Sequence, residues 1–211
     1  MIDEVKLNLA QESFISHDYQ TASDIYNDLL KEEPHNSYLL LNSGTSDYEI
    51  QNIGSALTKL YKAKKIMPRN KTLKNNIQLI ENKIQLNNPQ IFTLNFISFT
   101  ESLVLVLILN ILFLLRSRIS QNKIWKFSIS FLFFISLILS SLCFIEQKAS
   151  KYAFVTSISA DAYSGNNTAY SKLYELLDGQ LVKVIRKEDE WSQIKYNNSL
   201  GWIENEHIVL I

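Results

Sequence analysis

The residues that could carry out chemistry are few and lie far apart in the sequence. The three histidines, His17, His35 and His207, have no partners at metal-ligand spacing on one element beyond what chance supplies. The only cysteine, Cys143, lies within an apolar run, where it can form neither an intrachain disulfide nor a papain-like cysteine–histidine pair. The sequence also lacks a glycine-rich phosphate loop and a Gly-x-Ser-x-Gly nucleophile motif. We therefore expect no enzymatic activity, no metal and no cofactor.

Aromatic side chains near the C-terminus offer binding chemistry instead. Tyr163, Tyr170 and Trp191 could line a ligand groove, because aromatic rings combine a large apolar face with a polar edge. Trp202 could line the same groove, but we expect it to pack into the core. For Trp191 a groove role and a partly exposed structural role both stay open, and the two tyrosines could equally be ordinary loop residues.

The elements that would position these aromatic residues are short β-strands. Asp178 and Gly179 form a turn signal before a β-branched run, and Asn197 with Asn198 indicates a hairpin turn. The pattern predicts strands at residues 153–158, 181–185, 191–196, 201–203 and 208–211. Strands this short and closely spaced favour a small all-β barrel over residues 152–211.

The order of residues 177–184, 191–194 and 201–203 resembles a bacterial SH3-like domain. This resemblance implies a barrel with a ligand groove on its surface. Family members usually carry Arg-Ser-Gly before the second strand, where this chain has residues 162–165 with the sequence Ala-Tyr-Ser-Gly. One arginine that often lines the groove is therefore absent.

The N-terminal part contains an internal period of 34 residues. Pro34 and Pro68 are separated by this interval, and so are Ala22 and Ala56. A small residue at the closest approach of two helices and a proline after the second helix resemble the tetratricopeptide repeat. We expect an all-α domain over residues 1–86, with repeats at 3–36 and 37–70 and a terminal helix at 73–86.

The first helix of each repeat would line a concave, partner-binding face. Such repeats bind other proteins and do no chemistry of their own. The residues expected on this face are Leu7, Gln11, Phe14, Ile15, Leu41, Thr45, Tyr48 and Glu49. Peptide binding by this face and simple packing of repeat on repeat are both open.

Two apolar runs separate the helical and β-rich parts. Their length predicts a transmembrane hairpin over residues 92–146, with spans at about 96–115 and 126–145. The loop 116–126 is basic, which predicts a cytoplasmic loop with both flanking domains on the opposite side of the membrane. The bacterial resemblance of the C-terminal part then implies the bacterial inner membrane, with both flanking domains in the periplasm. Residues 1–11 show no apolar signal-peptide segment, so the opposite orientation also stays open. The lipid bilayer would then be one partner. The 21 basic and 21 acidic residues balance, so we expect no nucleic-acid partner.

The whole order of domains resembles the BatE-like proteins of the Bat (Bacteroides aerotolerance) system. The sharpest local matches are at residues 42–44, 52–54, 56–57, 61–63 and 68, followed by residues 74–77. The resemblance implies a multi-domain, non-enzymatic scaffold that works with von Willebrand A-type membrane proteins and a MoxR-type ATPase under oxygen or envelope stress. Two functions stay open, a protein–protein adaptor and an envelope sensor or anchor whose SH3-like domain binds peptidoglycan.

Overall fold

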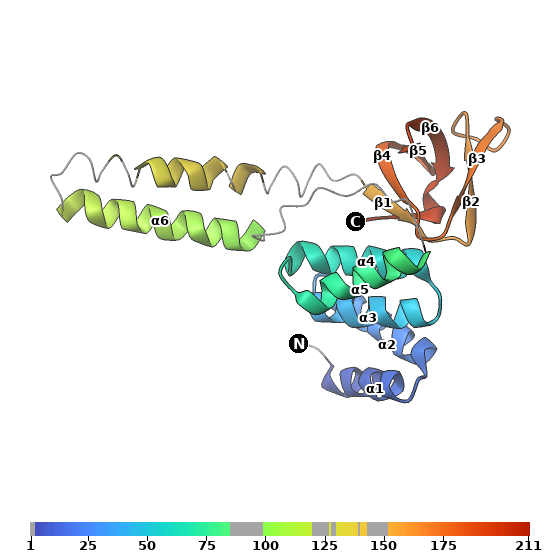
Figure 1. The fold of residues 1–211 in the computed structure, drawn as a ribbon, viewed down its shortest axis with the longest axis horizontal. Coiled ribbons are helices and arrows are strands. Elements are labelled where there is room, and N and C mark those ends of the chain that lie inside the picture. Colours follow the sequence, from blue (N-terminus) through green and yellow to red (C-terminus); the bar gives the residue numbers. More distant parts are fainter. Residues whose placement is uncertain (1–2, 85–98, 120–126, 128–129, 139, 143–151) are drawn as a thin grey trace. The chain divides into compact units, whose positions relative to one another are not determined.

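The computed structural model describes residues 3–84, 99–119, 127, 130–138, 140–142 and 152–211. The chain divides into two compact units (Figure 1). The first unit contains residues 1–91 and 151–211, so it combines the N-terminal helices with the C-terminal strands. The second unit contains residues 92–150.

The first unit begins with helices α1 (Glu4–Ile15), α2 (Tyr19–Glu32), α3 (Ser37–Glu49), α4 (Ile53–Ile66) and α5 (Lys71–Ile84). The first three begin where a side chain caps the free backbone N–H groups, from Asp3, Asp18 and Asn36 respectively. Because connections of only a few residues join the helices, each one packs against its neighbour in sequence.

Small residues set the spacing between these helices. Ala10 and Ala22 are fully buried in a core between α1 and α2 that also contains Tyr26, Leu29 and Leu39. Gly44 of α3 faces α4, where an added Cβ would lie 3.0 Å from Leu60 Cγ. These close approaches let the apolar faces of successive helices interlock.

The strands of the first unit are β1 (Tyr152–Val155), β2 (Ser159–Tyr163), β3 (Lys172–Leu177), β4 (Leu181–Glu188), β5 (Trp191–Tyr196), β6 (Ser199–Glu204) and β7 (Ile208–Leu210). They form one antiparallel sheet in the order β3-β2-β6-β5-β4-β1-β7. The sheet core contains Ala153, Val155, Ala160, Leu176, Val182, Val184, Ile194, Ile203 and Ile208.

The predicted closed barrel is wrong, because the sheet is open with β3 and β7 as its edges. Strands β2 and β3 were also absent from the five predicted strands. Their sequences, SADAY and KLYELL, contain no β-branched residue, so local propensity did not identify them. Register shifts at Ala162 and between Val184 and Arg186 bend the sheet without closing it.

A second core joins the helices to the sheet within the first unit. We call it the shared core; it contains Leu40, Leu41, Ala56, Leu57, Leu60, Tyr61, Ala63, Leu73, Ile77, Ile80, Phe154 and Leu181. Phe154 of β1 and Leu181 of β4 therefore lie among residues of α3, α4 and α5.

The second unit contains helix α6 (Phe99–Ile119) and helical residues at 130–138 and 140–142. Among the residues that the structure describes, no helix combines the length with the hydropathy that a membrane span requires. The predicted transmembrane hairpin over 92–146 is therefore wrong, and so are the inner-membrane localisation and the bilayer partner derived from it. Most of the predicted cytoplasmic loop, residues 120–126, lies outside the described residues.

The predicted spans rested on the length of two apolar runs in the sequence. A membrane span also requires that one helix of about 20 apolar residues coincide with such a run. Helix α6 begins and ends later than the predicted span at 96–115, so it includes Arg116 and Arg118 in addition to Glu101. In the second run the structure describes helical residues at 130–138 and 140–142.

Candidate functional site

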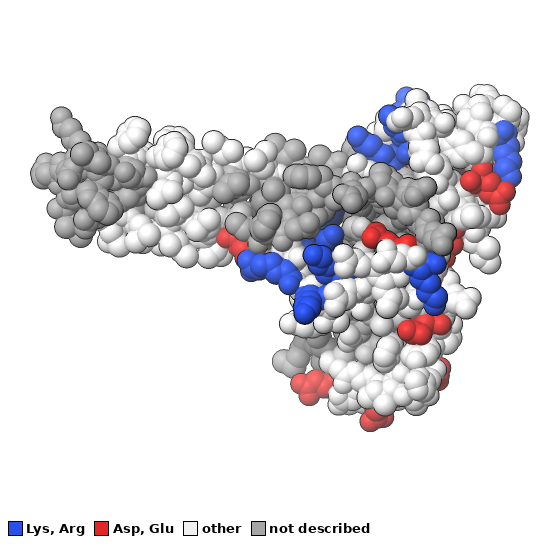
Figure 2. All heavy atoms as spheres, viewed as in Figure 1, with Lys and Arg blue, Asp and Glu red and all other residues white. Residues whose placement is uncertain are grey.

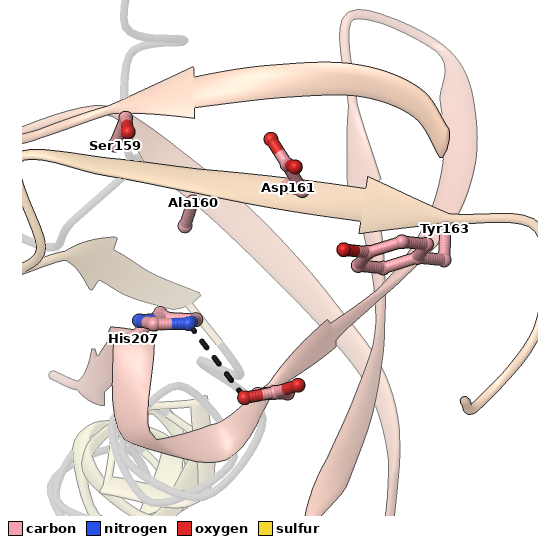
Figure 3. Close-up of a pocket in the computed structure, with 6 residues that line it drawn as sticks. Ser159, Ala160, Asp161, Tyr163 and His207 are labelled. Carbon is pink, nitrogen blue, oxygen red and sulfur yellow. Dashed lines mark ion pairs between the residues drawn. The ribbon is translucent and has the colours of Figure 1, made fainter. Parts of the chain in front are cut away.

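The candidate site is a hollow on the C-terminal sheet, with a volume of about 200 Å³ (Figure 3). Its residues come from β2 and from the segment where β6 passes into the 3-10 helix η1 (Asn205–His207). The lining residues are Ser159, Ala160, Asp161, Tyr163, Glu204 and His207. We call this hollow the β2–η1 pocket.

Hydrogen bonds fix the η1 side of the pocket. The Asn205 side chain accepts from Ser192 Oγ at 2.5 Å and donates through Nδ2 to the Asp189 carbonyl at 2.7 Å. The backbone N–H of Thr156 donates to the His207 carbonyl at 2.9 Å. The backbone that carries His207 is therefore tied to three separate parts of the domain.

The His207 ring is oriented by polar groups on both edges. Its Nδ1 lies 2.8 Å from Ser157 Oγ, while its Nε2 lies 3.7 Å from Glu204 and 3.8 Å from Glu206 (dashed line to Glu204 in Figure 3). One donor atom from each of Glu204, Glu206 and His207 lies within 4.8 Å of the others, so these three could hold a metal ion. Sequence reasoning missed this group, although the run Glu204-Asn-Glu206-His207 was its signal.

An aromatic pair borders the pocket. Tyr163 lines the pocket and meets Trp191 edge to face, with ring centroids 5.7 Å apart and planes at 80°. Trp191 is half-buried, so part of its ring faces solvent. Tyr170 lies in the loop between β2 and β3, where its ring packs on Gly165. Of the three predicted groove residues, the structure thus brings Tyr163 and Trp191 together.

Trp202 has a different environment from Trp191. Its side chain is only 7% exposed, and the Arg186 guanidinium lies 4.9 Å from the ring centroid. This arrangement allows a cation–π contact that shields the buried ring from solvent. The Trp202 side chain therefore packs in the interior of the domain, and little of its ring is exposed to a ligand.

Opposite charges surround the pocket. Lys172 of β3 pairs with Asp161 at 2.6 Å, and the hydrogen bond to Asp161 raises the pKa of the Lys172 ammonium. Glu204 and His207 are only partly exposed, whereas Glu206 is largely exposed. Basic and acidic side chains both occur over the helices and over the sheet on the face shown in Figure 2.

The residues predicted for the concave helical face occupy varied positions. In α1, Leu7 and Phe14 pack against the core between α1 and α2, whereas Gln11 and Ile15 are exposed. The Ile15 side chain is 77% exposed.

The α3 part of the predicted face contacts α5. Leu41 is buried in the shared core, and Thr45 Oγ1 accepts a hydrogen bond from Asn76 Nδ2 at 3.1 Å. The Lys83 ammonium lies 5.2 Å from the centroid of the Tyr48 ring, while Glu49 is exposed. Partner binding by this face stays a prediction.

The segment that forms the pocket matches a known protein family. The family model of the bacterial SH3 domain matches residues 159–209. This segment is a bacterial SH3 domain. The match includes every residue that lines the β2–η1 pocket and the Tyr163–Trp191 pair. No curated protein matches the chain. The tetratricopeptide assignment and the resemblance to BatE therefore remain predictions.

Proposed function

We propose that this chain is a non-enzymatic binding protein whose SH3 domain binds peptidoglycan through its peptide stems. The observation that carries the proposal is the Tyr163–Trp191 pair at the rim of a polar pocket, inside the segment matched by the bacterial SH3 domain. Bacterial SH3 domains commonly bind peptidoglycan, which supports this ligand class.

The chemistry of the pocket suits a short peptide with free amino groups. The exposed part of Trp191 offers an apolar platform for an alanine methyl group or an aliphatic side chain. The carboxylates of Asp161 and Glu204 can accept hydrogen bonds from amide or ammonium groups, and charged hydrogen bonds of this type are strong. Each of these contacts is a binding interaction, and none requires a chemical reaction.

The test is co-sedimentation of the full chain with insoluble purified peptidoglycan. We expect Trp191→Ala and Tyr163→Ala to weaken retention by at least about tenfold, as truncation of a central aromatic contact does at other interfaces. Tyr170→Ala is the matched control, because it removes an exposed ring of the same domain from outside the pocket lining. Absence of binding by the unaltered chain, or equal losses in all three variants, would refute the proposal.

A second proposal is the adaptor function that the resemblance to BatE implies, with von Willebrand A-type proteins and a MoxR-type ATPase as partners. Its support is the apolar surface of α1, where Val5 and Ile15 are 78% and 77% exposed. If α1 binds such partners, Val5→Ser with Ile15→Ser will abolish their capture and leave peptidoglycan binding unchanged. Capture of the same partners by the double variant would contradict a role for α1.

A further inference from the structure

The N-terminus of α4 is capped by a residue from the SH3 domain. The side chain of Asn52, at the N-cap position of α4, makes no capping hydrogen bond. Instead, the Asp178 carboxylate accepts the backbone N–H of Ile53 at 2.8 Å on Oδ2 and that of Gly54 at 2.9 Å on Oδ1. A carboxylate at this position satisfies free N–H groups and complements the positive end of the helix dipole.

Gly54 permits the backbone of the SH3 domain to reach the helix. A Cβ atom at residue 54 would overlap the Val155 carbonyl oxygen and lie 2.6 Å from Asp178 Oδ1. Any side chain at this position would therefore displace both β1 and the turn that carries Asp178. The absence of a side chain at Gly54 is a requirement of the contact between α4 and the sheet.

Strand β1 is buried on both of its faces. Ala153 and Val155 point into the sheet core, whereas Phe154 lies in the shared core with the helices. The Phe154 ring contacts the Tyr61 ring of α4, with centroids 5.3 Å apart. Because Phe154 is fully buried, separating the helices from the sheet would expose its whole ring to water.

The turn that carries Asp178 also makes backbone hydrogen bonds to β1 and to the segment between β1 and β2. The N–H of Asp178 donates to the Ile158 carbonyl at 3.3 Å, and the N–H of Gly179 donates to the Val155 carbonyl at 2.9 Å. Gly179 adopts a φ of 80°, which a side chain would strain. Ile158 directly precedes Ser159, so the capping turn and the pocket strand are joined by backbone contacts.

We infer that the helices α1–α5 and the SH3 domain form one cooperative unit in which Asp178 is the N-terminal cap of α4. The SH3 domain is then held against the helices by a packed interface and does not move independently of them. A ligand in the β2–η1 pocket would consequently keep a fixed position relative to the helices. This inference is independent of the ligand proposed above.

The test follows unfolding of the full chain in urea by pulsed hydrogen exchange and mass spectrometry. Peptides from α2–α4 report on the helices, and peptides from β4–β6 report on the SH3 domain. In the unaltered chain we expect one midpoint for both groups, as in a cooperative transition. In Asp178→Ala we expect two separate midpoints, with native-state exchange at Ile53 and Gly54 about 2- to 30-fold faster, the range expected for loss of a cap.

Two control variants make the result specific. Asp18 caps α2 from within the helices, through the N–H of Thr21 at 3.1 Å, so Asp18→Ala should lower stability but keep a single midpoint. Asp178→Asn retains an oxygen that can cap α4, so it should also keep a single midpoint. Two midpoints in the unaltered chain, or one unshifted midpoint in Asp178→Ala, would overturn the inference.

Discussion

A buried ion pair between α3 and α4 allows a quantitative test of how the helices are held together. The Asp47 side chain is only 2% exposed and lies 2.5 Å from the Lys59 ammonium, whose own side chain is 15% exposed. The same carboxylate accepts hydrogen bonds from Ser23 Oγ of α2 and Ser55 Oγ of α4, each at 2.5 Å. One side chain thus joins three helices.

Replacing Asp47 by alanine should be strongly destabilising. It leaves the Lys59 ammonium with Asn27 Oδ1, at 2.6 Å, as its remaining hydrogen-bond acceptor in the network. Removal of one partner from a buried ion pair typically costs about 3–5 kcal/mol. Since a domain of this kind has about 5–15 kcal/mol of total stability, Asp47→Ala should remove a large fraction of it.

The assay is urea unfolding of Asp47→Ala, Lys59→Met and the double variant. We expect the double variant to lose less free energy of unfolding than the sum of the single losses, with a coupling of about 1–3 kcal/mol. The control is Asp28→Ala, which breaks the exposed pair with Lys31 in α2 and should leave the midpoint unchanged. A loss below about 1 kcal/mol for Asp47→Ala would refute the reasoning.

Two further predictions concern aromatic residues. Trp202→Ala should lower the free energy of unfolding of the unit formed by the helices and the sheet by about 3–5 kcal/mol, because it removes a large buried ring. Trp191→Ala should change the thermal midpoint little, and the reverse order would contradict the assigned environments. Burial, together with the nearby Glu81 carboxylate, raises the pKa of the Tyr61 phenol above its ordinary value of 10.0. The folded chain therefore keeps a proton that the unfolded chain loses, so stability should fall as the pH rises above about 10. Tyr61→Phe should make that fall smaller in urea titrations.

The helical part follows from local rules in the sequence. The proline period and the small residues Ala22 and Ala56 indicated where helices end and where they approach one another. Asp47 was not identified in this way. A single acidic residue in a helical pattern resembles an exposed position, and it is buried only because α4 places Lys59 opposite it.

The candidate site was partly predictable for a similar reason. Tyr163 and Trp191 were recognised as aromatic groove candidates, but the pattern did not show that they touch. Glu204 is the last residue of β6, and His207 is the last residue of the 3-10 helix that follows, a short element with no strong sequence signature. Tyr170 was equally plausible by residue type, and only the loop geometry separates it from the pocket.

The boundary of the SH3 match and the physical boundary of the domain differ at β1. The match begins at Ser159, so it leaves out Tyr152–Val155. Yet β1 pairs with both β4 and β7, and its Phe154 fills part of the shared core. A fragment that begins at residue 159 would leave the inner edge of β4 unpaired and would separate β7 from the sheet. It would also remove a fully buried aromatic ring from the helices. Strand β1 therefore belongs equally to the SH3 domain and to the helical part, and it is the element through which each part stabilises the other.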